Sequence, residues 1–275
     1  FERGAGSLTG MRRAFALVAG LWKLGAAETL AYRASLIVWI ASTTFPLVSL
    51  VLWRALAEDG PIGGWQQQDF DSYFVAAFLV RQLTAVWVVW DLDRQIRTGD
   101  LSVLLLRPVS PILHHAINNL STQPLRLALA APLALAVLLA TGGFELVEDP
   151  RIWPLIPLAL ALAWLLSFVV QLAVACLAFW LTRASTLYEA YLGAFIVLSG
   201  YAVPTSLFPA GLAEVARALP FHAALGFPVE LVIGRLSLAE AFAGLGLQLA
   251  WLTAIGLLAL GLWRRGLRAY GAFGA

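Results

Sequence analysis

IWPLIPLALALAWLLSFVVQLAVACLAFW, residues 152–180, contains no acidic or basic side chain. A helix needs about 20 predominantly apolar residues to cross the hydrocarbon core of a membrane. This stretch exceeds that length, which predicts a helix that tilts or that projects beyond the membrane. Cys176, within the stretch, is the only cysteine of the sequence, so no internal disulfide framework is expected.

The composition of the whole chain agrees with this stretch. Hydrophobic residues make up 61% of the 275 residues, charged residues make up 12%, and the mean hydropathy is +0.83. A soluble domain usually carries about 25% charged residues. Inside a bilayer the backbone must satisfy its own hydrogen bonds, and long apolar runs do so as helices. The composition therefore predicts an all-α integral membrane protein.

Six segments are apolar and long enough to be transmembrane helices, by a threshold of about 18 to 20 residues. They are residues 35–56, 73–90, 120–141, 152–180, 186–203 and 238–263. The fifth segment is the weakest because Glu189 lies near its start.

Lysine and arginine are distributed unevenly about these segments. The N-terminal part, the loops after the second and fourth segments, and the C-terminus hold 13 of the 18: Arg3, Arg12, Arg13, Lys23, Arg33, Arg94, Arg97, Arg107, Arg126, Arg183, Arg264, Arg265 and Arg268. The opposite side holds Arg54, Arg151, Arg217 and Arg235, and Arg81 lies within a segment. Because cytoplasmic loops are enriched in these residues, both termini are predicted to be cytoplasmic.

The N-terminal part divides into two regions before the membrane domain. Residues 1–10 precede Met11 and are interpreted as a leader or tag-like segment. Residues 11–33 carry apolar side chains at three- and four-residue steps, which is typical of an amphipathic helix in the membrane interface. A signal peptide is the alternative, although Lys23 interrupts its apolar patch. The six-span membrane domain then covers residues 34–275.

Residues 200–237 are largely apolar but are divided by Pro204, Pro209, Pro220 and Pro228. The pieces are about ten residues long, and such a helix spans only about 15 Å, half of the hydrocarbon core. Short pieces can enter the outer half of the membrane and return when protein covers their interrupted backbone. We predict external re-entrant helices over residues 204–236. A loop resting on the lipid headgroups is the alternative.

The sequence contains no recognisable catalytic or metal site. An ATP-binding P-loop needs Gly-Lys followed by Ser or Thr, but the single lysine, Lys23, is followed by Leu24. His114, His115 and His222 lack further ligands at metal-binding spacing. We expect no catalytic residue, metal or cofactor on this chain, and no nucleic-acid partner.

Arg81 lies in the middle of the second segment, where an ionisable side chain is costly and is a candidate for function. Gln82, or Glu189 in the fifth segment, can satisfy the guanidinium. Two interpretations stay open. Arg81 is either a structural residue, in an interhelical ion pair or snorkelling, or a side chain that lines a path through the membrane.

DRQIRTGDLSVLLLRPVSPILHH, residues 93–115, is a polar interruption between the second and third segments. Residues 91–98 are expected to extend the second helix into the cytoplasm, and Gly99 is expected to end it in a left-handed conformation. Asp100 is a suitable N-cap for a short helix through Leu106. Arg107 and Pro108 would end this helix, and Ser110-Pro111 would start the next.

The short helix has an apolar ridge. Leu101, Leu104 and Leu105 share one face at three- and four-residue spacing. This geometry is suitable for docking into a groove on a soluble partner. The alternative is a helix packed on its own bundle.

IRTGDLSVLLLRPVSP (residues 96–111) resembles the cytoplasmic loop of permease subunits in ABC-type exporters of the second type, in which Ile-Arg-x-Gly and Leu-Leu-x-Arg-Pro recur. LSGYAVPTSLFP (198–209), followed by ALPFHAALGFPVELVIG (218–234), is similar to their external re-entrant region. With the interfacial N-terminal helix, the resemblance covers nearly the whole chain from Met11. It implies a multi-pass protein of the bacterial inner membrane.

The resemblance also implies residue roles and partners. The coupling helix to the ATPase would comprise Ile96, Arg97, Gly99, Leu101, Leu104, Arg107 and Pro108. The outer gate would be shaped by Pro204, Phe208, Pro209 and Pro220. The implied partners are a cytoplasmic ABC ATPase dimer, which would bind the ATP and magnesium, a second permease subunit, identical or paralogous, and membrane lipids.

Two other functions are compatible with the hydropathy of the chain. An ion-driven secondary transporter would usually show intramembrane acidic residues or an internal repeat. A membrane scaffold without transport activity needs neither. An exporter permease remains the prediction, and the sequence does not indicate the transported substrate.

Overall fold

The computed structural model describes residues 43–142 and 144–272, together with residues 19, 20, 22, 23, 25 and 27. The predicted leader, most of the predicted interfacial helix and residues 35–42 of the predicted first span lie outside the described residues. The described part of the chain is helical and contains no named strand, in agreement with the predicted all-α class.

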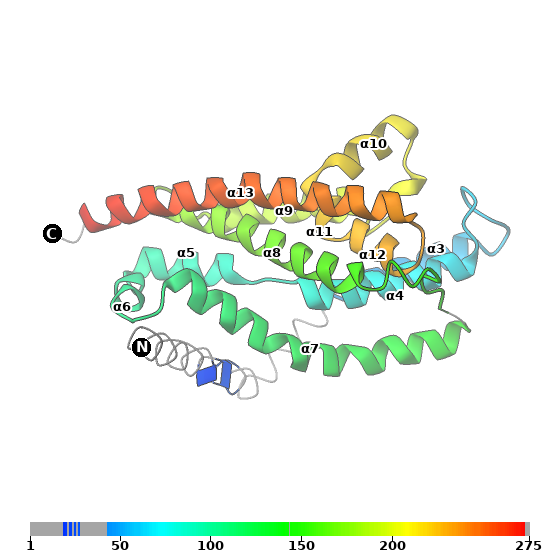
Figure 1. Ribbon diagram of the computed structural model, residues 1–275, viewed down its shortest axis with the longest axis horizontal. Coiled ribbons are helices and arrows are strands. Elements are labelled where there is room, and N and C mark those ends of the chain that lie inside the picture. The colour runs from blue at the N-terminus through cyan, green and yellow to red at the C-terminus, as the bar shows by residue number, and fades with distance from the viewer. Residues whose placement is uncertain are drawn as a thin grey trace, which may run out of the picture.

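The elements follow one another as a series of long and short helices (Figure 1). They are α3 (Phe45–Leu56), α4 (Gln67–Thr84), α5 (Val88–Thr98), α6 (Leu101–Leu105), α7 (Pro111–Thr141), α8 (Leu155–Cys176), the 3-10 helix η1 (Leu177–Phe179), α9 (Ser185–Leu198), the 3-10 helix η2 (Thr205–Leu207), α10 (Ala210–Ala218), α11 (Pro220–Ala224), α12 (Gly226–Val232) and α13 (Leu238–Ala272).

Four helical stretches of the described residues are long and apolar enough to cross a membrane. They are Gln67–Thr98, Pro111–Thr141, Leu155–Phe179 and Leu238–Tyr270. Two shorter apolar helices, α3 and α9, occupy parts of the first and fifth predicted spans. The chain is therefore a multi-pass helical membrane protein, while the count of six spans stays a prediction.

Two predicted spans are interrupted, which the hydropathy did not indicate. Thr43 and Thr44 precede α3 and are not helical, so the predicted span 35–56 is not one continuous helix. Residues 85–87 separate α4 from α5 within the predicted span 73–90. Pro46 explains the first boundary because proline fits the first turn of a helix. The second contains neither proline nor glycine.

The long helix α7 bends visibly along its length (Figure 1). Pro124 and Pro132 lie inside it, and each removes one backbone donor and crowds the preceding turn. Ser110 caps its start by accepting a hydrogen bond from the Leu113 backbone nitrogen at 3.2 Å, and Gly142 ends it at φ 90°. The predicted helix start at Ser110-Pro111 is confirmed.

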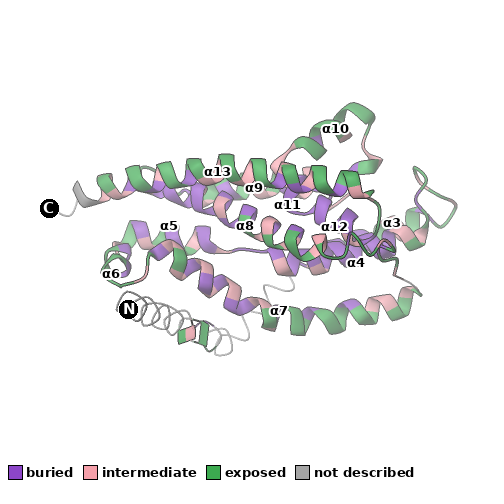
Figure 2. Ribbon diagram, in the orientation of Figure 1, coloured by how far each residue is buried: buried purple, intermediate pink, exposed green. Residues whose placement is uncertain are grey.

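Helix α4 lies at the centre of the bundle, whereas α7 and α13 lie at its outside (Figure 2). In an apolar stretch of 18 residues within Gln67–Thr98, 78% of the residues are buried. In the corresponding stretches of α7 and α13, only 17% are buried. Aromatic side chains fill the core around α4, with Phe70, Tyr73, Phe74 and Phe78 all fully buried. The outer apolar faces of α7 and α13 are the surfaces that lipid would cover.

The two ends of the bundle differ in character. Helix α6 and the C-terminal end of α13 lie at one end, while α3 and α10 lie towards the other (Figure 1). The arginines of α5 and of the last turns of α13 therefore gather at the α6 end. Arg126 was predicted to be one of the loop arginines on the cytoplasmic side. This was wrong, because Arg126 lies inside α7 and is 3% exposed. Removing it leaves the asymmetry of basic residues in place.

Candidate functional site

The turn between α5 and α6 has the conformation predicted from the sequence. Gly99 ends α5 in the left-handed region at φ 86°, and α6 begins at Leu101. Asp100 occupies the N-cap position, but its carboxylate accepts a hydrogen bond from Thr98 Oγ1 at 2.8 Å instead of capping α6. The predicted short helix and its glycine terminator are confirmed.

The side chains of α6 divide into an inner and an outer set. Leu101 and Leu104 are buried and face the chain's own helices, because α6 packs on α5 and α7. Val103, Leu105 and Leu106 are exposed. Of the predicted ridge, only Leu105 is therefore available to a partner. For Leu101 and Leu104, the structure agrees with the alternative interpretation, in which the helix packs on its own bundle.

The remaining predicted coupling residues lie on both sides of α6. Ile96 is buried in α5, in the same apolar cluster as Leu101. Arg97 forms an ion pair with Asp93, with Nη2 3.1 Å from Oδ2. Arg107 and Pro108 follow α6 and are exposed. The structure thus brings these residues together around one turn.

Asp93 has a role that the sequence did not indicate. Its side chain is 2% exposed, and one carboxylate oxygen accepts a hydrogen bond from the Ala184 backbone nitrogen at 3.1 Å while the other pairs with Arg97. Asp93 therefore joins α5 to the start of α9, 91 positions away. His115 behaves similarly, since its Nε2 lies 2.9 Å from Gln95 Oε1 and the ring is buried.

Side chains from other helices satisfy the broken backbone between α4 and α5. Arg126 Nη1 donates to the Ala85 carbonyl at 3.0 Å, and Gln123 Nε2 donates to the Leu83 carbonyl at 2.7 Å. Both donors come from α7. In a membrane, non-helical backbone needs such partners because no water replaces them.

Gln171 of α8 completes this network. Its Nε2 donates to the Val86 carbonyl, and its Oε1 accepts from the Val89 backbone nitrogen at 3.2 Å. Nε2 also lies 2.7 Å from the Tyr188 hydroxyl oxygen of α9. One amide side chain thus ties the helix break to α8 and α9. Arg126 lies inside the predicted span 120–141, and an ionisable residue there was a signal that the sequence analysis did not use.

Arg81 lies one turn before the break, in an aromatic environment. Its side chain is 9% exposed, and its guanidinium carbon lies 4.9 Å from the centroid of the Phe195 ring and 6.0 Å from that of Tyr201. Cation–π attraction acts at these distances. Glu189 is exposed, and no carboxylate of the described residues forms an ion pair with Arg81. Gln82 instead donates to Thr43 Oγ1 at 2.7 Å.

The proline-rich region is divided into short helices, and Pro204, Pro209 and Pro220 lie at their starts. Pro228 was predicted to divide the region too, but it lies inside the first turn of α12 (Gly226–Val232). Pro204 precedes η2 and is buried, whereas Phe208 follows η2 and is half-buried. Pro209 precedes α10, and Pro220 is the first residue of α11. Helices α11 and α12 are buried within the bundle, while α10 is exposed (Figure 2).

Side chains of α3, α4 and α13 donate hydrogen bonds to backbone carbonyls that these interruptions leave without a helical partner. Tyr73 donates to Gly200 at 2.9 Å, Trp53 to Ala202 at 3.1 Å, Gln248 to Ala223 at 2.9 Å and Trp251 to Ala218 at 2.9 Å. The short helices are therefore attached to α3, α4 and α13 by polar contacts as well as by packing. Re-entrant helices would require such cover, and their re-entrant course stays a prediction.

The described residues contain no group of three or more His, Cys, Asp or Glu that could hold a metal ion. Cys176 is buried in the apolar cluster around α5 and α8.

Comparison with known proteins gives one family. A family model described as "ABC-2 family transporter protein" matches residues 41–274. A search of curated proteins found no match.

Proposed function

Because the chain belongs to the ABC-2 transporter family, we propose that it is the permease of an ATP-driven exporter and that a separate ATPase subunit hydrolyses the ATP. The family assignment supports a transmembrane permease of an ABC transporter. The single lysine of the sequence has no P-loop context. ATP and magnesium would accordingly be bound by the ATPase and not by this chain.

The outer face of α6 is the observation that carries the coupling proposal. Val103, Leu105 and Leu106 are 57%, 41% and 88% exposed. Arg97 and Arg107, which precede and follow them in the sequence, are also exposed. An apolar patch rimmed by polar residues at the end of a bundle is typical of a protein interaction site. A groove on an ATPase subunit would cover it.

The inner contacts of α6 suggest how a movement there would reach the membrane. Leu101 and Leu104 attach α6 to α5 and α7, and Asp93 attaches α5 to α9. A push on α6 would therefore move three helices together instead of bending one loop. The break at residues 85–87 separates α5 from α4, so these helices can respond as rigid pieces on either side of it.

The proposal includes six spans, cytoplasmic termini, external re-entrant helices and a location in the bacterial inner membrane. The gathering of arginines at the α6 end supports this orientation. It also includes a second permease subunit, identical or paralogous. Phe45, Val48, Val51 and Leu52 form an exposed apolar face on α3, and the proposed second subunit would cover this face.

Co-purification with the ATPase tests the proposal. The tagged chain, expressed with its candidate P-loop ATPase, is expected to retain that ATPase in mild detergent. Leu106→Asp is expected to reduce retention at least about tenfold, because a desolvated apolar anchor contributes about 1.5 to 3 kcal/mol. Measuring the ATPase-to-permease ratio by quantitative mass spectrometry gives the result.

Leu212→Asp is the matched control. Leu212 is 45% exposed on α10, away from α6, so the same substitution there should leave retention unchanged. Equal retention by wild type and Leu106→Asp, both folded, would exclude α6 as the docking element. Failure of the wild type to retain any ATPase would count against the permease function itself.

A further inference from the structure

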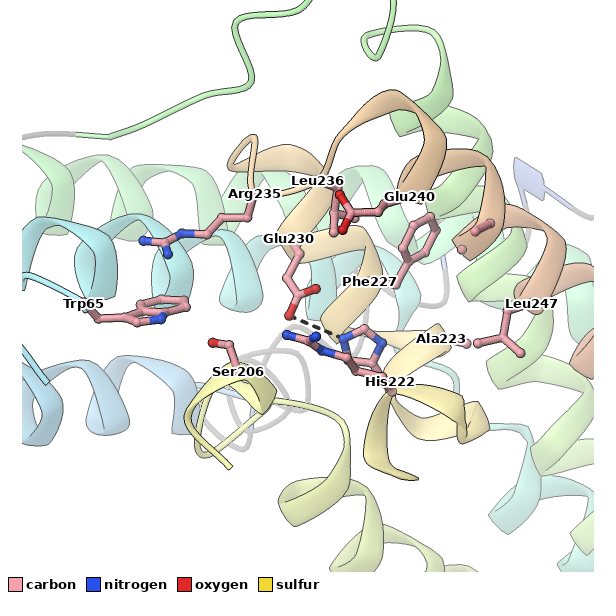
Figure 3. A pocket seen from close by; sticks show the side chains of 13 residues that line it. Trp65, Ser206, His222, Ala223, Phe227, Glu230, Arg235, Leu236, Glu240 and Leu247 are labelled. Atoms are coloured by element: carbon pink, nitrogen blue, oxygen red, sulfur yellow. Dashed lines mark ion pairs between the residues drawn. The ribbon is translucent and has the colours of Figure 1, made fainter. Parts of the chain in front are cut away.

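A cavity of about 480 Å³ lies away from the α6 end, between the short helices and the first turns of α13 (Figure 3). Its walls come from α10, α11, α12 and α13, with Trp65 at one side. Both signs of charge line it, which is unusual for a cavity in a chain with 12% charged residues. None of these charged groups takes part in the proposed ATPase docking.

Two basic side chains in the cavity, His222 and Arg217, form no side-chain hydrogen bond with the described residues. His222 is 5% exposed, and its Nε2 is buried without a hydrogen-bond partner. It lies 3.4 Å from Glu230 Oε1, an ion-pair distance, but the two groups are not aligned as a hydrogen bond. Arg217 is exposed and forms no ion pair with any described residue. A phosphate group accepts hydrogen bonds from such donors.

Two carboxylates lie in the same cavity, and each retains accepting capacity. Glu230 is 6% exposed, accepts a hydrogen bond from Thr205 Oγ1 at 3.2 Å, and points toward the His222 ring (Figure 3). Glu240 accepts the Ser237 backbone nitrogen at 2.8 Å through Oε2. In both residues the second carboxylate oxygen makes no hydrogen bond within the described part of the chain. A simple anion would be repelled by this pair of residues.

Arg217 lies within electrostatic range of one of these carboxylates. It is one of the groups that lower the pKa of Glu240, after the hydrogen bonds from Ser237. Arg235 is less available, since it pairs with Asp69 and stacks over the Trp65 ring at 4.0 Å. The available groups are therefore the guanidinium of Arg217 and the imidazole of His222, together with the carboxylates of Glu230 and Glu240.

The apolar part of the cavity continues onto the membrane-facing helix. Phe227, Ala243 and Leu247 line the wall, and Gly244 lets the Phe227 ring approach α13, because any Cβ there would overlap the ring. Ala243 and Leu247 are one turn apart on α13 and extend this wall along the helix. A ligand with a polar headgroup in the cavity can thus extend acyl chains along α13.

We propose that this cavity binds the headgroup of a zwitterionic phospholipid, with the phosphate on Arg217 and His222 and the ammonium group at Glu230 and Glu240. Phosphoethanolamine has the required combination of one anionic and one cationic hydrogen-bonding group. The site is contained within one chain, so the inference does not depend on the proposed coupling to an ATPase.

Lipid titration of the full chain tests the site. The detergent-purified protein is titrated with dioleoylphosphatidylethanolamine and, separately, dioleoylphosphatidylglycerol, and bound lipid is counted by native mass spectrometry. The phosphatidylethanolamine is expected to bind at least about fivefold more tightly. Arg217→Gln is expected to weaken its binding about tenfold, the effect of losing one charge-assisted hydrogen bond. Equal affinity for the two lipids would overturn the zwitterionic assignment.

Two further variants separate the site from general effects. Arg151→Gln removes an exposed arginine outside the cavity and should leave the affinity unchanged. Ala243→Trp keeps every charge but fills the cavity, and should weaken binding as Arg217→Gln does. Equal losses in Arg151→Gln and Arg217→Gln, or undiminished binding by Ala243→Trp, would refute a built site.

Competition with soluble phosphoethanolamine distinguishes a lipid from a free solute. Because acyl chains are expected to contribute along α13, the free headgroup should compete only at concentrations at least about a hundredfold higher. Competition at the same concentration as the lipid would refute the lipid assignment.

Discussion

Leu104 and Leu106 are two positions apart in sequence, yet one is 8% exposed and the other 88% exposed. The helical period places Leu104 towards α5 and α7, while Leu106 follows the last turn of α6 and extends outward. Identical side chains therefore have different roles, one in the chain's own stability and one on its surface. The sequence pattern placed Leu104 on one ridge with Leu105, which is 41% exposed.

Leu104→Asp is expected to destabilise the isolated permease, because it replaces a buried apolar side chain with a charge. The loss should be on the order of 3 kcal/mol, visible as a lower melting temperature in detergent. Leu106→Asp is the control and should melt as the wild type does. A normal melting temperature for Leu104→Asp would show that Leu104 does not support the α5–α6 packing.

Arg126 illustrates a buried cation whose hydrogen bond is structural. Its guanidinium donates to the Ala85 carbonyl at the helix break, 41 positions away. Arg126→Met keeps much of the side-chain volume but leaves that carbonyl without its donor, which should cost about 1 to 3 kcal/mol of stability. Thermal unfolding in detergent measures the effect. Arg265→Met, at an exposed position of α13, should show no resolvable change, and an equally small effect at Arg126 would contradict the role assigned to it.

At the scale of elements, the turn between α5 and α6 depends on one backbone conformation. Gly99 has φ 86°, and a Cβ at this position would meet only the Tyr270 hydroxyl, at 3.9 Å. Gly99→Ala should therefore cost about 1 to 2 kcal/mol from backbone strain alone. Hydrogen exchange should show faster opening of α6 than in the wild type.

Gly246→Ala is the matched control for the turn. Gly246 lies inside α13, and a Cβ there would meet no atom within 4 Å. Alanine is favoured over glycine in a helix interior by about 0.5 to 1 kcal/mol, so this variant should be as stable as the wild type or more so. If both variants behaved alike, the left-handed conformation of Gly99 would not be what holds the turn.

The helix ends that could be predicted from the sequence are those determined by residues at the ends themselves. Gly99, Ser110-Pro111 and the prolines between 204 and 228 act on their own backbone, and the helix ends lie near them. The break at residues 85–87 was not predicted, because hydropathy averages over it and its stabilising partners lie on α7 and α8.

Site residues were less predictable than helix ends, because their roles depend on partners that are distant in the sequence. Asp93 and Gln171 gain their roles from contacts with Ala184 and Val86, which are 91 and 85 positions away. A single sequence carries no signal for such pairs. The burial of Leu101 and Leu104 depends likewise on how α6 folds back on α5 and α7.

At the scale of the whole molecule, the bundle has one end rich in exposed arginine and one end built from α3 and the proline-divided helices (Figure 1). Asp100 is at the first end, close to the C-terminal turns of α13, since Gly99 approaches the Tyr270 hydroxyl. Glu148 lies in the loop before α8. In this loop the Val147 backbone nitrogen donates a hydrogen bond to the Val232 carbonyl of α12. These two positions should therefore be on opposite sides of the membrane, whichever side is cytoplasmic.

Cysteine labelling shows whether the two positions lie on opposite sides of the membrane and which of them is cytoplasmic. Cys176 is buried and is replaced by alanine to remove the only natural thiol of the sequence. In intact cells, a membrane-impermeant maleimide should label Glu148→Cys and leave Asp100→Cys unlabelled, because basic residues favour the cytoplasmic side. In permeabilised cells both should react. Labelling of Asp100→Cys in intact cells would reverse the proposed orientation, and labelling of both positions there would contradict the arrangement of the two ends of the bundle.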